Sequence, residues 1–438
     1  MRVLLANIIK IFLTIFNKSG TTLPGRVLNT FYKDTLEKYR DQYKNIILIS
    51  GTNGKTTINR ILTSVLSKGY SVISNQEGAN LHSGITTTVL LSQGIFRKKT
   101  YDFLILEVDE SIIGMISNKL EANYLLIGNL TMDQIDRHIN VLTLAFRIND
   151  SIKKSDMKVI VNQNDPYAML ATKNTNQYLV RTLPKDQNKN NNQIINCLNC
   201  GFDIEIREVD TFIQNGSGGI KAKYHCLNCQ LGIGKTIEPP IKWERKGSLS
   251  FRYNDQKITP KLSGLYNREN IIMSLALLEK LNISISHIKQ GIGSIKKIKG
   301  RNETFLINGN KVTLQLVKNP ASVHQTFKEI KGKDVTQIAF LFNNELSDGL
   351  DTTWIKQINF AKLNEFASNL NICIGGSQKD KIEEEIFDVA KGNNIFRFKD
   401  VSSLFSEKVL GETYILANYS LLSDIRRELV QLQREWES

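Results

Sequence analysis

A short glycine-rich loop, residues 51–57 (GTNGKTT), constrains the fold of this 438-residue chain more than any other feature. It follows an apolar run at residues 44–50, which predicts a buried parallel strand, and it precedes a helix-like stretch at residues 58–68 that Gly69 ends. A strand, a glycine loop with a lysine, and a helix in this order are typical of phosphate loops, because glycines let backbone N–H groups approach phosphate oxygens. The sequence therefore predicts a nucleotide-binding α/β domain.

The roles of the loop residues follow from the chemistry of triphosphates. Lys55 would reach the β- and γ-phosphates of ATP, and the Thr56 hydroxyl would ligate Mg²⁺. The standard pattern has a further glycine where Ile49 stands, so the loop is a shortened variant, and a chance glycine-rich turn is the alternative. The residues assigned to ATP binding in the loop are Gly51, Thr52, Asn53, Gly54, Lys55, Thr56 and Thr57.

Apolar runs alternate with helix-like stretches beyond the loop and predict a parallel α/β sheet that binds ligands at the carboxyl ends of its strands. Further strands are expected at residues 71–75, 101–108, 124–127 and 159–162, and a helix at residues 269–280. A second α/β unit is expected to have strands at residues 337–342, 371–374 and 414–417 and a closing helix at residues 423–436. The expected domains are an N-terminal helical segment (1–45), a central ATP-binding domain (46–303) and a C-terminal Rossmann-like α/β domain (304–438).

Four of the five cysteines form two Cys-x-x-Cys knuckles, which indicate a tetrahedral zinc site. The knuckles lie in an expected zinc ribbon, inserted at about residues 194–237 of the central domain, and Gly201 follows the first knuckle where a tight turn is needed. Four sulfur ligands close the site, so the zinc would be structural, and disulfides are the poorer explanation if the protein is cytoplasmic. Cys373, in an apolar strand, is expected to be core. The four ligands are Cys197, Cys200, Cys226 and Cys229.

The chain carries a formal net charge of +14. A basic surface can meet nucleic acid, anionic lipid or a phosphate-bearing substrate, but a lysine-rich surface without a specific partner explains the charge equally well. The charge alone therefore names no ligand.

The first residues, 3–16, are strongly apolar and interrupted by Lys10. This run is too short to span a bilayer, which takes about 20 apolar residues. We expect a helix that packs on the protein, with peripheral contact to a membrane as the alternative. Because the rest of the chain has no spanning segment, we expect the protein in the cytoplasm.

The loop sequence GTNGKTT is the form found in Mur ligases and folylpolyglutamate synthases, and the resemblance extends over roughly residues 20–320. It includes residues 77–80 (EGAN), 84–87 (GITT), 106–110 (LEVDE), 129–131 (NLT) with Asp133, Gln134, Asp136 and Arg137, 164–166 (NDP), 264–267 (GLYN) and 300–303 (GRNE). These segments occur in the order of the family. The chain thus resembles the Mur ligase family.

Further features resemble the MurT-like branch of this family. They are the cysteine ribbon, residues 22–26 (TLPGR), residues 316–321 (LVKNPA) and the stretch from Asp348 to Trp354, which resembles DGxDxSW. Only about 45 residues precede the phosphate loop, so no full UDP-binding domain is expected before it. The chain departs from the branch at Thr353, Lys356 and Gln357, so the resemblance does not fix the contacts of this stretch with substrate or partner.

The resemblance implies roles for several residues outside the loop. Glu107, at the end of a strand, would bind Mg²⁺ together with Thr56, although a carboxylate paired with a lysine is the alternative. Asn267, Asn270 and Arg301 would bind ATP, with helix capping and an ordinary surface arginine as the alternatives. The implied catalytic residues are Lys55, Glu107, Asp348 and Asp351.

The resemblance also implies a reaction and a partner. The reaction would be ATP-dependent amidation of the D-glutamate α-carboxylate of lipid II through an acyl phosphate. A separate GatD-like glutaminase subunit would supply ammonia, because no Cys–His glutaminase motif is visible in this chain. Asp348 or Asp351 would complete the Cys–His pair of that partner, although Asp348 before a glycine is also a common turn residue.

Two other functions compete with this one. An amino-acid-adding Mur ligase or a folylpolyglutamate synthase-like ligase would share the loop but is not expected to carry the cysteine ribbon. A zinc-ribbon protein that binds nucleic acid would explain the charge but leaves the phosphate loop, Glu107 and the GRNE segment without a role.

Overall fold

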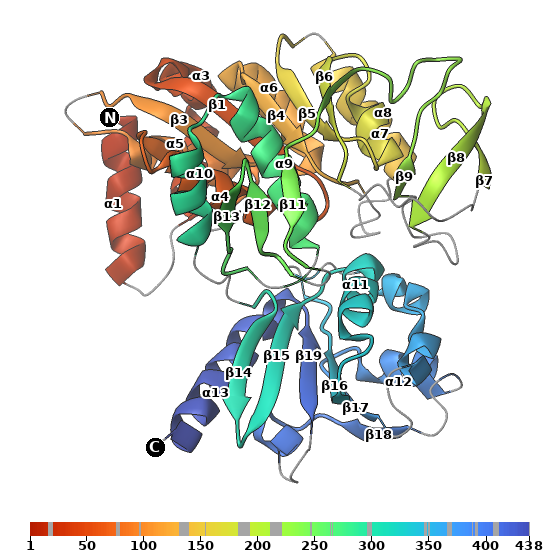
Figure 1. Ribbon diagram of the computed structural model, residues 1–438. Helices are drawn as coiled ribbons and strands as arrows, with labels where there is room; N and C mark the ends of the chain where they lie inside the picture. Colours follow the sequence, from red (N-terminus) through yellow and green to blue (C-terminus); the bar gives the residue numbers. More distant parts are fainter. Residues whose placement is uncertain are drawn as a thin grey trace.

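The computed structural model comprises two α/β units, one above the other in Figure 1. The first unit is built on a seven-stranded sheet and the second on a six-stranded sheet. The structure describes residues 1–15, 21–75, 79–95, 98–130, 140–153, 155–182, 193–210, 221–245, 248–262, 264, 266–295, 300–345, 348, 351–365, 370–387, 389, 393–405 and 411–437.

The seven-stranded sheet is parallel throughout and has the order β10-β6-β5-β4-β1-β3-β2. Its interior strand β1 (Tyr43–Ser50) alternates between two cores: Ile46 and Leu48 face one, and Ile47 and Ile49 face the other. This alternation explains the unbroken apolar run at residues 46–49, since helices cover both faces of the sheet. The strands are β1 (Tyr43–Ser50), β2 (Val72–Ser74), β3 (Tyr101–Glu107), β4 (Tyr124–Ile127), β5 (Lys158–Asn162), β6 (Asn176–Val180) and β10 (Lys235–Ile237).

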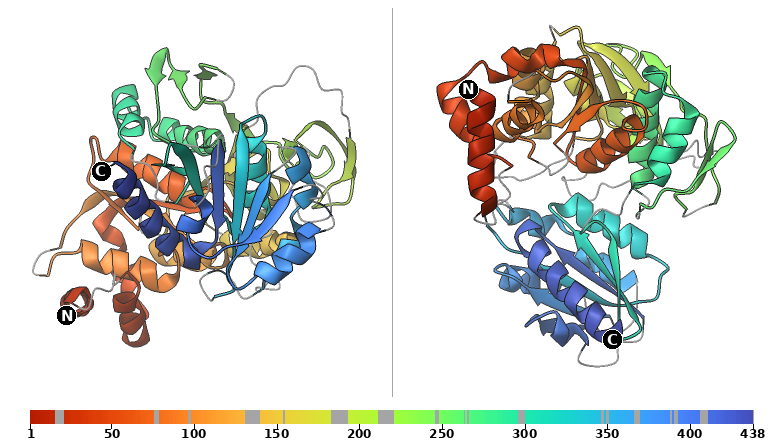
Figure 2. Two further views of the ribbon diagram at one scale, coloured as in Figure 1. Left: turned by 90° about the horizontal axis from the view of Figure 1, so that it is seen from below. Right: turned by 90° about the vertical axis from the view of Figure 1, so that its left-hand side faces the viewer.

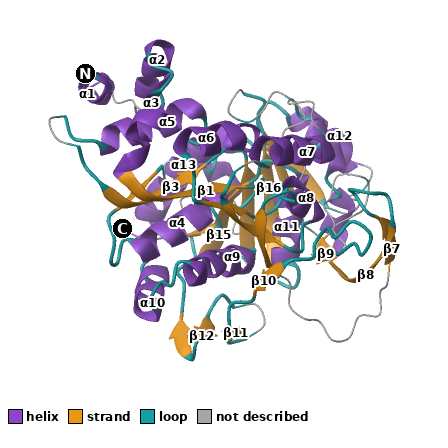
Figure 3. Cartoon of the chain, turned by 90° about the horizontal axis from the view of Figure 1, so that it is seen from above, coloured by secondary structure: helices purple, strands orange, loops and turns teal. Residues whose placement is uncertain are grey.

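Two layers of helices enclose this sheet, as Figure 3 shows. One layer contains α4 (Lys55–Leu66), α9 (Asn267–Lys280) and α10 (Ile285–Gly293). The other contains α5 (His82–Ser92), α6 (Ile113–Leu120), α7 (Val141–Ile152) and α8 (Pro166–Ala171). A three-stranded antiparallel sheet, β11 (Ile241–Trp243), β12 (Phe251–Tyr253) and β13 (Gln256–Ile258), packs against the first layer.

The second unit has a sheet of order β14-β15-β19-β16-β17-β18, in which only the edge strand β14 is antiparallel. Helices cover both faces, and α13 lies on the opposite face from α11 and α12. The elements are β14 (Glu303–Ile307), β15 (Asn310–Leu316), α11 (Pro320–Ile330), β16 (Val335–Leu341), η4 (Thr353–Gln357), η5 (Phe360–Glu365), β17 (Asn371–Gly375), α12 (Lys379–Phe387), β18 (Asn394–Arg397), η6 (Ser402–Phe405), β19 (Glu412–Ala417) and α13 (Tyr419–Glu437).

Helices precede β1: α1 (Arg2–Ile15), α2 (Leu23–Phe31), α3 (Thr35–Tyr39) and η1 (Arg40–Gln42). Helix α1 stands at the outer edge of the first unit in Figures 1 and 2. Among the described helices, none combines the length and the apolar character needed to cross a membrane.

The parallel α/β architecture predicted from the sequence is confirmed, and each expected strand is present within a few residues. The predicted helix starts were too late: the helix after the phosphate loop begins at Lys55 and not at residue 58, and the closing helix begins at Tyr419 and not at residue 423. Gly54 adopts a left-handed conformation with φ of 90° as the N-cap, so the helix starts directly after it. Lys55, Thr56 and Thr57 therefore lie in the first helical turn. The division of the chain into domains at residues 45 and 303 stays a prediction.

Candidate functional site

The phosphate loop lies at the carboxyl ends of the parallel strands, where β1 turns into α4. Both of its glycines are required by close contacts. A Cβ on Gly54 would stand 2.2 Å from the Asn270 side-chain oxygen, and a Cβ on Gly51 would stand 2.9 Å from the Asn129 carbonyl oxygen. Glycine at both positions therefore lets the loop pack closely against its neighbours. The free N–H groups at the N-terminus of α4 point toward the space above the loop.

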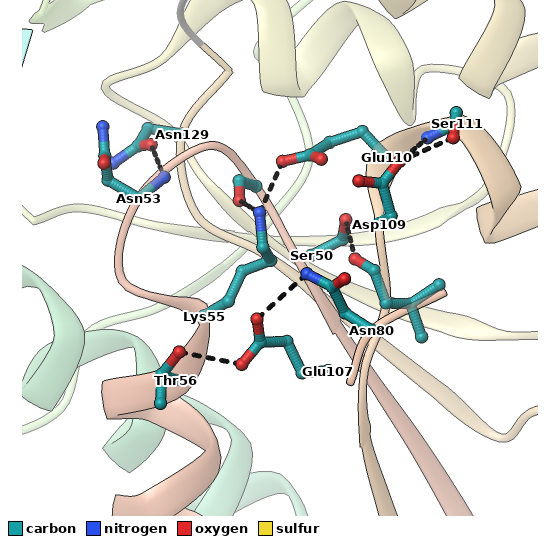
Figure 4. A network of polar contacts seen from close by, with 12 residues as sticks. Ser50, Asn53, Lys55, Thr56, Asn80, Glu107, Asp109, Glu110, Ser111 and Asn129 are labelled. Atoms are coloured by element: carbon teal, nitrogen blue, oxygen red, sulfur yellow. Dashed lines mark hydrogen bonds and ion pairs between the residues drawn. The ribbon is translucent and has the colours of Figure 1, made fainter. Parts of the chain in front are cut away.

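Asn129 holds the loop from the neighbouring strand β4. Its backbone carbonyl accepts a hydrogen bond from the Thr52 N–H at 2.7 Å, and its side-chain oxygen accepts one from the Asn53 N–H at 3.0 Å (Figure 4). The residues that follow, 131–139, lie outside the described part of the chain, so the motif residues Thr131, Asp133, Gln134, Asp136 and Arg137 are not placed. The same holds for Glu77 and Gly78.

Lys55 is largely buried and spans the loop. Its Nζ donates to the Gly51 carbonyl oxygen at 2.7 Å and forms an ion pair with Glu110 Oε1 at 2.9 Å (Figure 4). Sequence reasoning missed this role of Glu110, which lies three residues after the end of β3 and begins the short helix η2 (Glu110–Ile112). An ammonium group fixed across the loop in this way is positioned to meet the charge of a nucleotide phosphate.

Glu107 and Thr56, which the sequence assigned together to Mg²⁺, lie in contact. The Thr56 hydroxyl donates to Glu107 Oε2 at 2.9 Å, and the Asn80 amide donates to Glu107 Oε1 at 3.2 Å (Figure 4). Asn75 fixes the backbone of Glu107 through two hydrogen bonds of 2.8 Å. A buried carboxylate beside a threonine hydroxyl is a pair of hard oxygen ligands that suits Mg²⁺, and the Asn80 amide keeps the carboxylate oriented.

Asn267 and Asn270 lie in the first turn of α9 and approach the loop from the side. The Asn270 amide donates to Asn267 Oδ1 at 2.8 Å, and the close approach to Gly54 places Asn270 directly against the loop. The N-cap residue of α9 is Tyr266, and its side chain makes no capping hydrogen bond. The asparagines therefore lie just inside the helix, next to the phosphate loop, and their role in ATP binding stays a prediction. Leu265, within the same motif, lies outside the described residues.

Two arginines approach this site from different parts of the chain. Arg60 follows Thr56 by one turn of α4, and Arg301 lies in the segment that leads into β14. Burial lowers the pKa of the Arg60 guanidinium, the positive charge of Arg301 lowers it further, and the carboxylate of Glu107 raises it. The Nε of Arg60 is buried and has no hydrogen-bond partner among the residues that the structure describes. Like charges held near each other favour an anion between them, so Arg60 is a candidate that sequence reasoning missed.

The GRNE segment divides into two roles. Its glutamate, Glu303, accepts two hydrogen bonds of 2.9 Å from the Arg426 guanidinium on α13 and one of 2.7 Å from the Gly300 N–H. Glu303 therefore fixes the segment that contains Arg301 to α13 of the second unit.

The four knuckle cysteines converge, as their spacing predicted. Their sulfur atoms lie within 4.8 Å of one another, with 3.6 Å between Cys197 and Cys229 and 3.7 Å between Cys200 and Cys226. A tetrahedron with zinc–sulfur bonds of about 2.3 Å has sulfur–sulfur edges of about 3.8 Å, so the cluster fits a zinc ion. All four are free thiols, which excludes disulfides between them in this structure.

The backbone around the cysteines repeats in both knuckles. The Cys197 N–H donates to the Phe202 carbonyl oxygen and the Cys226 N–H to that of Leu231, both at 2.8 Å. Strands β7 (Gln193–Asn196), β8 (Asp203–Asp210) and β9 (Lys221–Lys223) complete the ribbon, which joins the sheet at β10. The ribbon is thus an insertion at one edge of the first sheet, packed through Cys197, Cys226 and Tyr224 on the main core.

The thiols differ in acidity. The hydrogen bond that the Asn228 amide donates to its sulfur lowers the pKa of Cys200 to about 6, whereas burial raises the pKa of Cys226 to about 12. A divalent metal binds thiolates and would supply the positive charge that the buried sulfur needs to ionise. The donor set leaves no open ligand position, so the ion would be structural.

Loss of one ligand tests this assignment. Cys226→Ser is expected to lower bound zinc from one ion per chain to a small fraction, and to lower the unfolding temperature, because metal binding and local folding are linked. Elemental analysis of protein purified without chelator measures the zinc. Cys373→Ser is the matched control, since Cys373 is buried in β17 away from the cluster. Equal zinc in the Cys226→Ser variant and the unmodified chain would refute the four-cysteine site.

The two aspartates predicted to serve a partner lie in the second unit, apart from the phosphate loop. Asp348 is 8% exposed, and its Oδ1 accepts a hydrogen bond of 2.8 Å from the Ser420 N–H in the first turn of α13. Asp351 is half-exposed, and its Oδ1 accepts one of 2.7 Å from the Thr353 N–H at the start of η4. Asp348 thus caps a helix, whereas Asp351 is the more accessible carboxylate. Gly349 and Leu350 between them are outside the described residues.

Comparison with known proteins places this geometry in a family. The model of the Mur ligase middle domain matches residues 49–229, and that of the MurT ligase C-terminal domain matches residues 316–422. The chain is 28% identical to the MurT subunit of the glutamine-hydrolysing lipid II isoglutaminyl synthase of Streptococcus pneumoniae, over 94% of this chain and 93% of that protein. It is 25% identical to the corresponding subunit of Staphylococcus aureus strain N315, over 96% and 94%.

Solved structures show the same fold. The MurF ligase of Thermotoga maritima in complex with ADP superposes with a TM-score of 0.59 at 16% identity, over 92% of this chain and 84% of that one. The folylpolyglutamate synthase of the same organism gives a TM-score of 0.54 at 14% identity, over 94% of each chain. The fold expected from the sequence resemblance is therefore confirmed. The chain thus combines a Mur ligase middle domain, which carries the phosphate loop, with a MurT-type C-terminal domain, and it is similar to MurT subunits along nearly its whole length.

Proposed function

We propose that this chain is the synthetase subunit of a two-subunit enzyme that amidates lipid II in peptidoglycan biosynthesis. The observation that carries the proposal is the similarity to MurT subunits along nearly the whole chain, including the MurT-type C-terminal domain. The product would be D-isoglutamine, formed at the α-carboxylate of D-glutamate with ATP as the energy source. A GatD-like glutaminase would be the second subunit.

The chemistry starts from the low reactivity of a carboxylate, from which ammonia cannot displace oxide. A carboxylate oxygen therefore attacks the γ-phosphorus of ATP, the bond to ADP breaks, and an acyl phosphate forms. Ammonia then attacks the acyl carbon, inorganic phosphate leaves, and the surplus proton of the nitrogen passes to solvent. The leaving group of the second step is thus phosphate in place of oxide.

The described residues can support the first step. Lys55 would stabilise negative charge on the transferring phosphoryl group, and Thr56 and Glu107 would hold Mg²⁺, which supplies Lewis-acid stabilisation when bound. Arg60 and Arg301 would bring two further positive charges to the same region. Glu107 ends β3, and Lys55 and Thr56 directly follow the loop after β1, which agrees with the usual place of ligands in parallel α/β sheets.

The nitrogen source would lie on the partner. Glutaminases of the Cys–His type need an acidic group to orient the histidine, and we assign that group to Asp351 because it is more accessible than Asp348. Asp348 would instead support the site by capping α13. A lipid-linked acceptor would place the reaction at the inner face of the cell membrane.

Reconstitution tests the proposal. The purified chain receives lipid II, ATP and Mg²⁺ with either ammonium or glutamine, with and without the glutaminase subunit, and amide formation is followed by mass spectrometry. The chain alone should amidate with high ammonium and fail with glutamine, and the partner should restore the use of glutamine. Glutamine-dependent amidation by the chain alone would contradict the two-subunit enzyme.

One alternative is an amino-acid-adding ligase, because such ligases have the same fold and one of them is 22% identical to this chain. The same reaction mixture distinguishes it. Addition of an amino acid in place of ammonia would assign the chain to that class and overturn the amidation.

A further inference from the structure

Helix α1 presents an open face made entirely of apolar side chains. Its other side packs on the protein through Val3, Ala6 and Leu13, against Leu28 of α2 and Leu90 of α5. At 100° per residue, the exposed apolar residues gather on the opposite side of the helix. We call this surface the α1 face; it consists of Leu4, Leu5, Ile8, Ile11, Phe12 and Ile15.

The exposure of the α1 face is high for residues of this type. Ile11 is 61% exposed, Phe12 59% and Ile15 71%. Apart from Arg2, the polar residues of the helix are Asn7, Lys10 and Thr14, which follow one another along one flank and leave the α1 face without a charge. A helix that is apolar on two opposite sides is normally buried on both, so we expect a binding partner to bury the α1 face.

The helix is held in a fixed orientation on the body of the protein. Arg2 donates hydrogen bonds to both carboxylate oxygens of Asp34, at 2.8 and 3.1 Å, and its guanidinium stacks on the ring of Tyr32 at 4.4 Å. Together with the packed side, these contacts prevent the helix from turning its apolar residues inward. The α1 face therefore lies opposite the packed side of the helix, and the helix itself stands at the outer edge of the first unit (Figures 1 and 2).

The charge of the residues around helix α1 indicates what kind of partner binds the α1 face. Residues 1–45 contain eight Lys and Arg against three Asp and Glu, and the whole chain carries +14. The exposed basic residues include Lys10 on the flank of α1 and Arg26, Lys33 and Lys38 on and beside α2 and α3. An exposed apolar helix face in a segment with an excess of basic residues matches a bilayer surface with anionic headgroups, which attracts the charges while its acyl region accepts the apolar side chains.

A protein partner fits the α1 face less well. Stable protein interfaces bury roughly 1,200–2,000 Å² and involve roughly 20–30 residues on each side, and one convex helix face of six side chains supplies only a small part of that. An interfacial helix needs no such area, because its apolar side inserts directly into the lipid.

We infer that the α1 face docks the protein on an anionic lipid bilayer, with the helix lying parallel to the membrane surface. The inference extends the proposed function, since a lipid-linked acceptor lies in such a membrane, and it would let the enzyme meet its substrate by diffusion in two dimensions. The α1 face itself is identified from the exposure of its residues and from the surrounding charge, independently of the proposed reaction.

Vesicle binding by the full chain tests the inference. Vesicles of phosphatidylcholine alone and of phosphatidylcholine with phosphatidylglycerol are sedimented with the protein, without acceptor or ATP, so the result is independent of the proposed reaction. The triple variant Ile8→Gln, Ile11→Gln, Ile15→Gln keeps good helix formers on an exposed face and should remain folded. It should bind the anionic vesicles at least roughly tenfold more weakly than the unmodified chain, because three isoleucines no longer enter the lipid.

A matched control separates the α1 face from general hydrophobicity. Leu306→Gln, Phe387→Gln and Trp436→Gln together replace three equally exposed apolar residues of the second unit and should leave vesicle binding unchanged. Undiminished binding by the α1 variant, or no binding by the unmodified chain, would overturn the inference. A dimer of the unmodified chain that dissociates in the α1 variant, without any vesicle binding, would assign the face to a second copy and also overturn it.

Discussion

Lys55→Ala is expected to lower ATP turnover by roughly a thousandfold or more, since loss of one preorganised group at a site of developing charge commonly costs a factor of that size. Lys55 is the ammonium group that spans the phosphate loop, bound to the Gly51 carbonyl oxygen and paired with Glu110. A methyl group in its place removes the positive charge that would stabilise the transferring phosphoryl group. Release of ADP in the presence of acceptor and ammonium measures the effect.

The control for this variant is Lys68→Ala, which removes an exposed lysine just beyond the end of α4. It should leave turnover within a small factor of that of the unmodified chain. Circular dichroism should show that both variants are folded. Undiminished ADP release by the Lys55→Ala variant would show that residues 51–57 are not the phosphate loop of this enzyme.

Asp351→Asn is expected to have the second largest effect, and the effect should be confined to amidation with glutamine as the nitrogen source. With the glutaminase subunit present, glutamine-dependent amidation should fall by a factor on the order of 10³–10⁴, the range found when the acidic member of a catalytic triad becomes an amide. Ammonium-dependent amidation should stay unchanged, because Asp351 lies in the second unit at the start of η4 and not at the phosphate loop. The ratio of the two rates is the measurement.

Asp348→Asn serves as the matched variant for Asp351→Asn. An asparagine at this position can still accept the hydrogen bond from the Ser420 N–H, so the cap of α13 should survive and both rates should remain within a few-fold. Equal losses with glutamine and ammonium in the Asp351→Asn variant would assign Asp351 to the ligase chemistry. A selective glutamine defect in Asp348→Asn in place of Asp351→Asn would reverse the two roles.

The sequence predicted the structure correctly where the local residue pattern of a segment reflects its tertiary environment. β1 is an apolar run because helices cover both of its faces, so its hydrophobicity alone located it. The cysteine knuckles were equally clear, because a metal site imposes fixed spacing on the chain, and their sulfur atoms do converge. The meeting of Thr56 with Glu107 was also expected, since one follows β1 and the other ends its neighbour β3.

The rest depends on contacts between distant segments, which leave no local pattern. The Lys55–Glu110 ion pair, the hold of Asn129 on the phosphate loop and the approach of Arg60 to Arg301 are all of this kind. The choice between Asp348 and Asp351 likewise needed the position of α13, whose first turn binds only Asp348. Short strands such as those of the β11–β13 sheet, with three residues each, carry too little alternation to be recognised.

The central claim is that this chain activates a carboxylate as an acyl phosphate and then forms an amide from it. The most direct test labels the α-carboxylate of the D-glutamate in lipid II with a heavy oxygen isotope and follows the label during ammonium-dependent amidation. The account predicts that one labelled oxygen per amide appears in inorganic phosphate, because the carboxylate oxygen that attacked the γ-phosphorus leaves with it. Amide formation with no label in phosphate, or with label in AMP, would contradict the account.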